Sequence, residues 1–114
     1  MPFIHSRVSA TMTQQQKETI IKELGEAIAI IPGKSEEWLM VELADQCDLY
    51  FRGRREKALA YIEVKVFGKI SADAARSLTE RICAIYETHL QIEKDCIYIK
   101  YEEVSKWGWN GSNF

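Results

Sequence analysis

The sequence predicts an α/β (α+β) fold in which duplicated β-α-β units form a four-stranded sheet with two helices on one face. Three observations predict it. Segments in which apolar and polar residues alternate, as in β-strands, flank two segments whose apolar residues recur with helical period. The order strand-helix-strand occurs twice, in residues 2–44 and 59–102. The chain of 114 residues also has the size of one ordinary domain. We therefore expect a single domain over residues 1–114, built from two pseudo-repeat halves.

The first unit opens with a short apolar strand over residues 3–8. Thr13 and Gln16 have the spacing of a capping box and predict the start of a helix. The apolar residues of this helix recur at intervals of about 3.6 residues, and they are Ile20, Ile21, Leu24, Ala27, Ile28 and Ile31. A Pro-Gly pair at 32–33 ends the helix, and residues 38–44 predict a buried strand.

The second unit follows a polar connection over residues 45–57. Residues 59–67 alternate between apolar and polar side chains, which indicates a half-buried strand. Ser71 or Asp73 can cap a second helix. Its apolar side again has helical period, with Leu78, Ile82, Ile85, Tyr86 and His89. The last strand is expected over residues 96–102.

Each strand-helix-strand unit implies a parallel strand pair with a right-handed crossover. Two such units give one sheet with both helices on the same face. The opposite face should then be apolar, and the simplest partner to cover it in so small a chain is another copy. We therefore expect an oligomer.

The charge balance excludes several classes of partner. The chain has 15 Lys and Arg residues against 17 Asp and Glu residues, for a formal net charge of −2. This balance disfavours broad binding to nucleic acid or to anionic membranes. No signal peptide and no apolar run long enough to span a bilayer is evident. We expect a cytoplasmic protein, with non-classical secretion left open.

The cysteines and histidines predict neither a disulfide scaffold nor a metal site. Cys47, Cys83 and Cys96 are an odd number of thiols, and no two of them form a Cys-x-x-Cys motif. His5 and His89 have no neighbour at metal-ligand spacing.

Five motifs carry a family resemblance, and they follow one another along the whole chain. They are Met1-Pro2, Pro32-Gly33-Lys34, Phe67-Gly68-Lys69-Ile70, Ile97-Tyr98-Ile99 and Trp107-Gly108-Trp109-Asn110-Gly111-Ser112. Together with the duplicated unit they resemble the macrophage migration inhibitory factor branch of the tautomerase superfamily. The resemblance implies a homotrimer whose sheets line a central channel, with an active site at each subunit interface. It also implies keto-enol tautomerisation of the phenylpyruvate tautomerase or dopachrome isomerase type, on an α-keto acid or enol and without a cofactor.

The resemblance gives Pro2 and Lys34 the central roles. In the family, removal of Met1 exposes the Pro2 nitrogen as a secondary amine, which is the general acid-base. If Met1 persists, this nitrogen is an amide without basicity. Lys34 matches a lysine that meets the substrate carboxylate. By their residue types alone, Pro2 is also a rigid first residue of a strand, and Lys34 is a lysine that favours the C-terminal end of a helix dipole.

The remaining pocket residues are also implied by the resemblance. Phe67 falls where the family usually has an isoleucine whose backbone contacts substrate. Tyr98 matches a tyrosine contributed across the interface, and Trp109 matches a tryptophan of the tail. Trp38 and Phe114 fall near aromatic positions of the same pocket, although a packed core or tail explains these aromatic residues nearly as well.

Three departures from the family pattern bear on function. Lys100 stands where the family has asparagine, so it either adds a cation that favours a more anionic substrate or pairs with Glu63 or Glu102 on a solvated face. The vertebrate Cys-x-x-Cys is replaced at Leu59 and Ile62, so thiol-disulfide chemistry is not implied. The loop over residues 51–57 is more basic than in the family and could recognise an acidic partner, although exposed charge runs are usually only solvated.

Two rival interpretations stay open. The chain could be a non-enzymatic, cytokine-like protein that binds a receptor or a host partner on the same trimeric scaffold. It could also be a trimeric tautomerase with a different substrate, and Lys100 is the residue that favours this interpretation.

Overall fold

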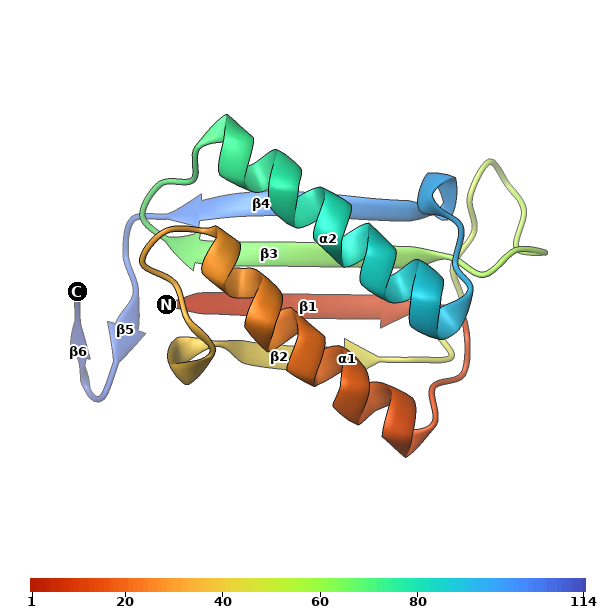
Figure 1. The fold of residues 1–114 in the computed structure, drawn as a ribbon, viewed down its shortest axis with the longest axis horizontal. Coiled ribbons are helices and arrows are strands. Elements are labelled where there is room, and N and C mark those ends of the chain that lie inside the picture. The colour runs from red at the N-terminus through yellow and green to blue at the C-terminus, as the bar shows by residue number, and fades with distance from the viewer.

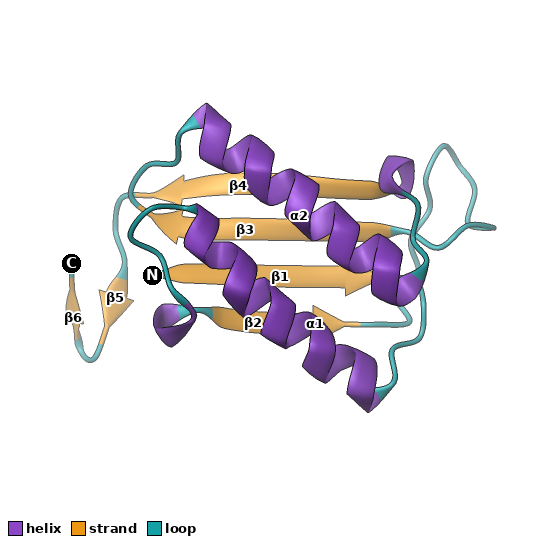
Figure 2. Ribbon diagram, in the orientation of Figure 1, coloured by secondary structure: helices purple, strands orange, loops and turns teal.

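The computed structural model describes residues 1–114 and has one main sheet and two long helices (Figures 1 and 2). The main elements in chain order are β1 (Pro2–Val8), α1 (Gln14–Ala27), β2 (Met40–Ala44), β3 (Ala60–Phe67), α2 (Ala72–Leu90) and β4 (Ile97–Val104). Short 3-10 helices occur at η1 (Ile28–Ile30), η2 (Glu36–Trp38) and η3 (Lys94–Cys96). A small hairpin of β5 (Gly108–Trp109) and β6 (Ser112–Asn113) follows the last long strand.

The sheet has the strand order β2-β1-β3-β4. β1 pairs with β2 in parallel, and β3 pairs with β4 in parallel. The two units meet where β1 pairs antiparallel with β3 at the centre. Both helices lie across one face of the sheet (Figure 1). The predicted fold of two strand-helix-strand units with two helices on one face is therefore confirmed.

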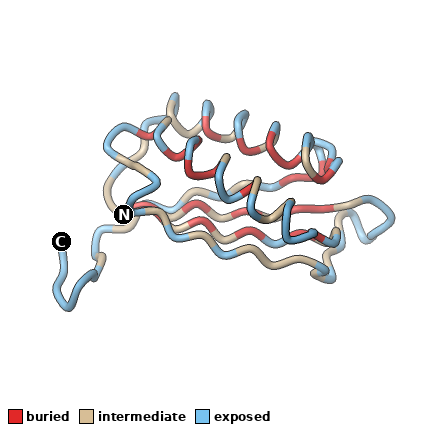
Figure 3. Tube along the Cα trace, turned by 60° about the horizontal axis from the view of Figure 1, so that its bottom comes forward, coloured by how far each residue is buried: buried red, intermediate tan, exposed pale blue.

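The core lies between this face and the helices, as the buried segments of Figure 3 show. Alternate residues of the two central strands are fully buried, among them Ile4 on β1 and Ile62 and Val64 on β3. They pack with the apolar stripes of the helices, which include Leu24 and Ile82. The buried residues of β3 and the apolar stripes of α1 and α2 thus face each other across one apolar layer.

One polar pair is buried in this layer. Ser6 on β1 is the buried polar residue of the core, and the phenol of Tyr86 on α2 donates a hydrogen bond of 2.6 Å to Ser6 Oγ. Burial raises the pKa of Tyr86 to about 12, and the hydrogen bond with Ser6 opposes this shift. The pair fixes α2 against the central strand at one position.

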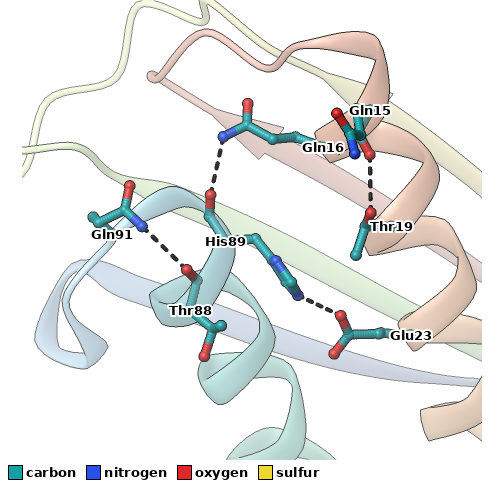
Figure 4. Close-up of polar contacts among 7 residues, drawn as sticks. All are labelled: Gln15, Gln16, Thr19, Glu23, Thr88, His89 and Gln91. Atoms are coloured by element: carbon teal, nitrogen blue, oxygen red, sulfur yellow. Dashed lines mark hydrogen bonds and ion pairs between the residues drawn. The ribbon is translucent and has the colours of Figure 1, made fainter.

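Polar contacts also join the two helices at one end (Figure 4). The ring Nε2 of His89, in the last turn of α2, contacts Glu23 Oε2 on α1. The side-chain amide of Gln16 donates to the His89 carbonyl oxygen at 3.0 Å, which satisfies one of the free carbonyls at the helix end. Thr13 and Gln16 form the predicted capping box at the start of α1.

Several details of the sequence prediction are wrong. The second strand was expected to be buried, but β2 is at the edge of the sheet and its residues are half-buried or exposed. Trp38 was expected in the second strand, but it lies in η2, and β2 begins at Met40. The backbone bends here because the Leu39 N–H donates to the Glu36 carbonyl oxygen at 3.1 Å and closes a 3-10 turn. The first strand also begins one residue earlier than expected, at Pro2, and the last strand continues to Val104 instead of ending at residue 102.

The larger error concerns the face of the sheet without helices, which we call the open face. It was expected to be apolar, but it carries a row of ionisable groups across all four strands. In the strand register Glu42, His5, Glu63 and Lys100 lie next to one another. The His5 ring is 3.7 Å from Glu42 and 3.8 Å from Glu63, and Lys100 Nζ is 3.9 Å from Glu63. A sheet with one covered face commonly presents polar residues on the other.

Neither of the two long helices has the apolar length that a passage through a bilayer needs.

Candidate functional site

The candidate site lies where the chain begins. β1 is an internal strand of the sheet, so its first residue emerges at one end of the sheet between β2 and β3. Pro2 is buried there, opposite Val66 in the register of β3. The C-terminal hairpin lies beside the same end of the sheet (Figure 1). Both ends of the chain therefore meet at one place.

Backbone and lysine contacts surround the first residue. The Phe67 N–H donates to the Met1 carbonyl oxygen at 3.0 Å. Lys34 Nζ donates to the Phe67 carbonyl oxygen at 2.7 Å, so the ammonium group contacts the backbone of the same residue. Lys34 reaches this place because Gly33, with φ of +82°, turns the chain back after η1.

This environment acts on the charge of the terminal amine. The pKa of the Met1 amino group is lowered from 8.0, first by burial, then by the positive charge of Lys34 and by a hydrogen bond with it. Each of these causes disfavours the charged form. A terminal amine held here is therefore neutral over more of the physiological pH range than an exposed one.

Four aromatic rings form a wall beside the first residues. Trp38 meets Trp109 edge-to-face, with ring centroids 4.9 Å apart. Phe114 lies 6.3 Å from Trp109 and 5.7 Å from Phe67. The hairpin holds Trp109 and Phe114 in place because the Phe114 N–H donates to the Trp107 carbonyl oxygen at 3.0 Å. Trp109 and Phe114 remain about half exposed, which leaves their rings free to contact a ligand.

A cavity of about 690 Å³ lies within this arrangement. Met1, Pro2, Trp38, Trp109 and Lys65 are among its lining residues. Its volume is within the range of small-molecule sites, and its lining is mostly apolar with a few charged groups.

A second cavity of about 480 Å³ lies near the basic loop, lined by Arg52, Arg54 and Lys57. It is at the other end of the sheet, next to the start of β4. None of the residues that the resemblance assigns to substrate lines it, so we place the candidate site at Pro2.

The structure brings together most of the expected site residues and separates two of them. Pro2, Lys34, Phe67 and Trp109 gather at the first end of the sheet. Tyr98 does not, because it lies opposite Tyr61, which pairs with Arg7 of β1.

Arg7 is five residues along β1 from Pro2, or about 17 Å at 3.4 Å per residue. The ring of Tyr98 packs edge-to-face on Phe51, with centroids 5.4 Å apart. Tyr98 of the same chain therefore cannot reach the cavity beside Pro2.

Lys100 is also remote from the cavity of its own chain. Its ammonium lies 3.6 Å from Glu102 and 3.9 Å from Glu63, and its side chain is half exposed. Of the two interpretations of Lys100, the pairing with Glu63 and Glu102 is therefore present in the single subunit. A contact of Tyr98 or Lys100 with substrate requires the cavity of a second subunit.

Lys65 and Phe3 line the cavity but are not among the site residues expected from the sequence. They lie opposite each other on the open face, in the antiparallel register of β1 and β3. The alternation of β3 placed Lys65 on a polar face, but it did not reveal that β1 is the neighbouring strand. The pairing between the two units was the missing signal.

One cluster has the residue types of a metal site. Ligand atoms of Glu93, Asp95 and Cys96 lie within 4.8 Å of one another. Glu93 already pairs with Lys57 at 2.9 Å, and burial raises the pKa of the Cys96 thiol, which opposes the thiolate form that binds metals. We assign no metal to this cluster.

The chain is similar to known proteins in sequence and in fold. The chain is 28% identical over 99 residues to the macrophage migration inhibitory factor of Meriones unguiculatus, which covers 85% of each chain.

Two solved structures have the same fold. Leishmania major MIF2 matches with a TM-score of 0.92 and 28% identity, covering 100% of this chain and 97% of that one. The macrophage migration inhibitory factor homologue of Prochlorococcus marinus matches with a TM-score of 0.88 and 32% identity, covering 98% of each chain. The sequence pattern of the family described as macrophage migration inhibitory factor (MIF) matches residues 1–114. The chain therefore belongs to the macrophage migration inhibitory factor family, as the resemblance of its motifs indicated.

Proposed function

We propose that this chain is a keto-enol tautomerase of the phenylpyruvate or dopachrome type, in which the amine of Pro2 is the general acid-base. Membership of the family supports a tautomerase or migration-factor-like function. The arrangement around Met1 supports the tautomerase in particular.

The observation that carries this proposal is the pair of contacts on Phe67. With Met1 in place, its carbonyl oxygen accepts the Phe67 N–H at 3.0 Å, and the Lys34 ammonium donates to the carbonyl oxygen of the same residue. Removal of Met1 takes away this oxygen and turns the Pro2 nitrogen into a free secondary amine. A proline amine, an unoccupied backbone N–H and a lysine ammonium are then side by side. An anionic oxygen of a substrate can occupy the place of the Met1 oxygen.

These groups fit a tautomerisation in which a single base carries a proton between a carbon and an oxygen of the substrate. The neutral Pro2 amine removes a proton from the carbon next to the substrate carbonyl, and the electron pair forms the carbon-carbon double bond of the enolate. The protonated amine then gives this proton to the enolate oxygen, which forms the enol and restores the neutral base. The reverse sequence returns the keto form. Lys34 holds the carboxylate and stabilises the developing negative charge. The reaction rearranges one molecule, so its atoms and electrons balance without a cofactor.

The cavity in one subunit lacks the tyrosine that the resemblance assigns to it. Tyr98 is too remote from Pro2 of its own chain, so we propose that the active form is a homotrimer in which Tyr98 of a neighbouring subunit completes the site. The open face, with its charged row, would line the central channel of this trimer.

The first test asks whether the amine is the base. Intact-mass measurement establishes that Met1 has been removed, and phenylpyruvate turnover is then followed in the wild type and in Pro2→Gly. We expect kcat/KM to fall by roughly 10²- to 10⁴-fold in Pro2→Gly. A matched control inserts one alanine before Pro2, which keeps the proline but makes its nitrogen an amide, and it should also be inactive.

The pH profile gives a second readout. The base must be neutral, so kcat/KM for proton removal should rise with pH through the pKa of the Pro2 amine. Burial and Lys34 lower the pKa of the Met1 amine, and we expect the same causes to act on the Pro2 amine, so its midpoint should lie below that of an exposed N-terminal proline. Full activity of Pro2→Gly, or an unchanged rate in the form with Pro2 blocked, would refute the mechanism. No turnover by wild-type protein with a free Pro2 amine would favour the cytokine-like alternative.

A further inference from the structure

We propose that the cavity beside Pro2 contains a second anion subsite at Lys65, so that the chain selects keto acids with two negatively charged groups. This inference rests on the proposed tautomerase function and specifies its substrate class. It concerns a residue outside the set that the family resemblance assigns.

The strand register places Lys65 at the cavity. Lys65 lies on the open face of β3, directly opposite Phe3, while the preceding residue of β1, Pro2, is opposite Val66. Lys65 and Pro2 both line the cavity of about 690 Å³. Lys65 therefore lines the same space as the proposed base and comes from β3, whereas Lys34 comes from the connection between η1 and η2.

Lys65 differs from the other lysine on the open face by having no carboxylate partner. Lys100 lies within 3.9 Å of both Glu63 and Glu102. Glu102 is the residue of β4 opposite Lys65, but in the structure it pairs with Lys100 at 3.6 Å. Lys65 is half-buried and makes no ion pair within 4.0 Å.

An ammonium that is partly removed from water without a partner is unfavourable for the free protein, and an anion bound in the cavity would relieve that cost. The other charged residue of the lining, Glu37, is exposed, so water screens its repulsion of an anion. The charge of Lys65 is therefore available to a ligand.

The two lysines are placed to bind different parts of one molecule. Lys34 is held at the Phe67 carbonyl oxygen, whereas Lys65 projects from β3 two residues earlier, about 7 Å along the strand. A single carboxylate beside Phe67 occupies the Lys34 position and leaves Lys65 unpaired. A second anionic group at the far end of the substrate would pair with Lys65, and the ring between them would contact Trp38 and Trp109.

The test uses two substrates that differ by one carboxylate, phenylpyruvate and 4-carboxyphenylpyruvate. The measured quantity is the ratio of their kcat/KM values, in protein with Met1 removed. We expect this ratio to fall roughly tenfold or more in Lys65→Met, because a hydrogen-bonded charge pair with the second carboxylate is lost. Lys65→Arg should retain most of the preference. Raising the salt concentration should lower the wild-type ratio toward that of Lys65→Met.

A matched control removes the same charge elsewhere. Lys22 is exposed on α1, on the far side of the helix layer, and Lys22→Met should leave the ratio unchanged. If the ratio is the same in wild type and Lys65→Met, the subsite is refuted although the tautomerase function stands.

If the wild type turns over neither substrate, the tautomerase function fails, and the subsite is tested by calorimetry. The ligands are then the unreactive 3-phenylpropanoate and its 4-carboxy derivative. A preference for the dianion that is lost in Lys65→Met supports the subsite without catalysis, and equal affinities in both proteins refute it.

Discussion

The two faces of the four-stranded sheet are made from the same strands but have opposite chemistry. On β3 the residues Ile62 and Val64 are fully buried against the helices, whereas Glu63 and Lys65, which alternate with them, lie on the open face. One face removes apolar surface from water, and the other presents ionisable groups and aromatic rings. The comparison indicates that the helix-covered face stabilises the subunit, while the open face and its edge are available for binding and assembly.

The largest expected effect on stability comes from the helix-covered face. Ile62 is fully buried and lies next to Ser6 and Ile99 in the sheet. Ile62→Ala should lower the free energy of unfolding by about 2–5 kcal/mol, because it loses apolar burial and leaves a cavity in a packed layer. Urea unfolding followed by circular dichroism measures this change.

The matched variant on the open face is Lys65→Met, from the same strand. It should change the free energy of unfolding by less than about 0.5 kcal/mol, since the lysine has no ion pair to lose. If the two variants destabilised the subunit equally, the conclusion that the helix-covered face, and not the open face, stabilises the subunit would be wrong.

The next effect concerns the one polar pair inside the apolar layer. Tyr86→Phe removes the hydroxyl that donates to Ser6 at 2.6 Å and leaves the buried Ser6 hydroxyl without this partner. We expect a loss of about 1–3 kcal/mol. Tyr86→Phe with Ser6→Ala should be less destabilised than the sum of the single variants, because the double variant leaves no unpaired buried hydroxyl.

The same pair predicts a response to alkaline pH. Burial raises the pKa of Tyr86 from 10.0 to about 12, so the folded state binds this proton more tightly than the unfolded state. The resulting stability is complete below pH 10 and is lost as the pH rises from 10 toward 12, by up to roughly 1 kcal/mol per pH unit. Tyr86→Phe should show a shallower loss over this range in urea unfolding at stepped pH. If the free energy of unfolding depends on pH identically in both proteins, a group other than Tyr86 causes the loss of stability at alkaline pH.

The sequence predicted the helix-covered face well because its signals are local. The helical period of the apolar residues and the N-capping motifs predicted α1 and α2. The alternation of apolar and polar side chains in residues 59–67 predicted which residues of β3 are buried. The expectation of an apolar open face failed because it came from a general packing rule. The residues that alternate with the buried ones, such as Glu63 and Lys65, already showed a polar face.

The site was predictable only where a motif could be matched to a family. Pro2, Lys34 and Trp109 come from segments far apart in the chain, and only the motifs made them candidates before any contact was known. Lys65 was missed because its place depends on the pairing of β1 with β3, which joins the two units. Local periodicity contains no information on such a pairing, since the residues in contact are more than fifty positions apart.

A small effect on stability is expected for Lys100→Asn, which introduces the residue that the family usually has. Lys100 is half exposed, and its contacts with Glu63 and Glu102 are 3.9 Å and 3.6 Å long, so the subunit should lose less than about 1 kcal/mol. Salt should weaken even this contribution. Glu102→Gln is the matched control, because it breaks one of the same pairs and leaves the lysine in place.

The effect of Lys100→Asn on activity bears on assembly. Lys100 is two strands from β1. Its register partner is Glu63, which pairs with His5, and His5 is three residues, or about 10 Å, from Pro2 along β1. A change in KM for phenylpyruvate without a change in unfolding would therefore have to arise in the cavity of another subunit. Sedimentation equilibrium on the same sample establishes whether a trimer is present. An unchanged KM in a trimeric protein would limit Lys100 to its ion pairs on the open face, and Tyr98 would then be the one residue still proposed to cross the interface.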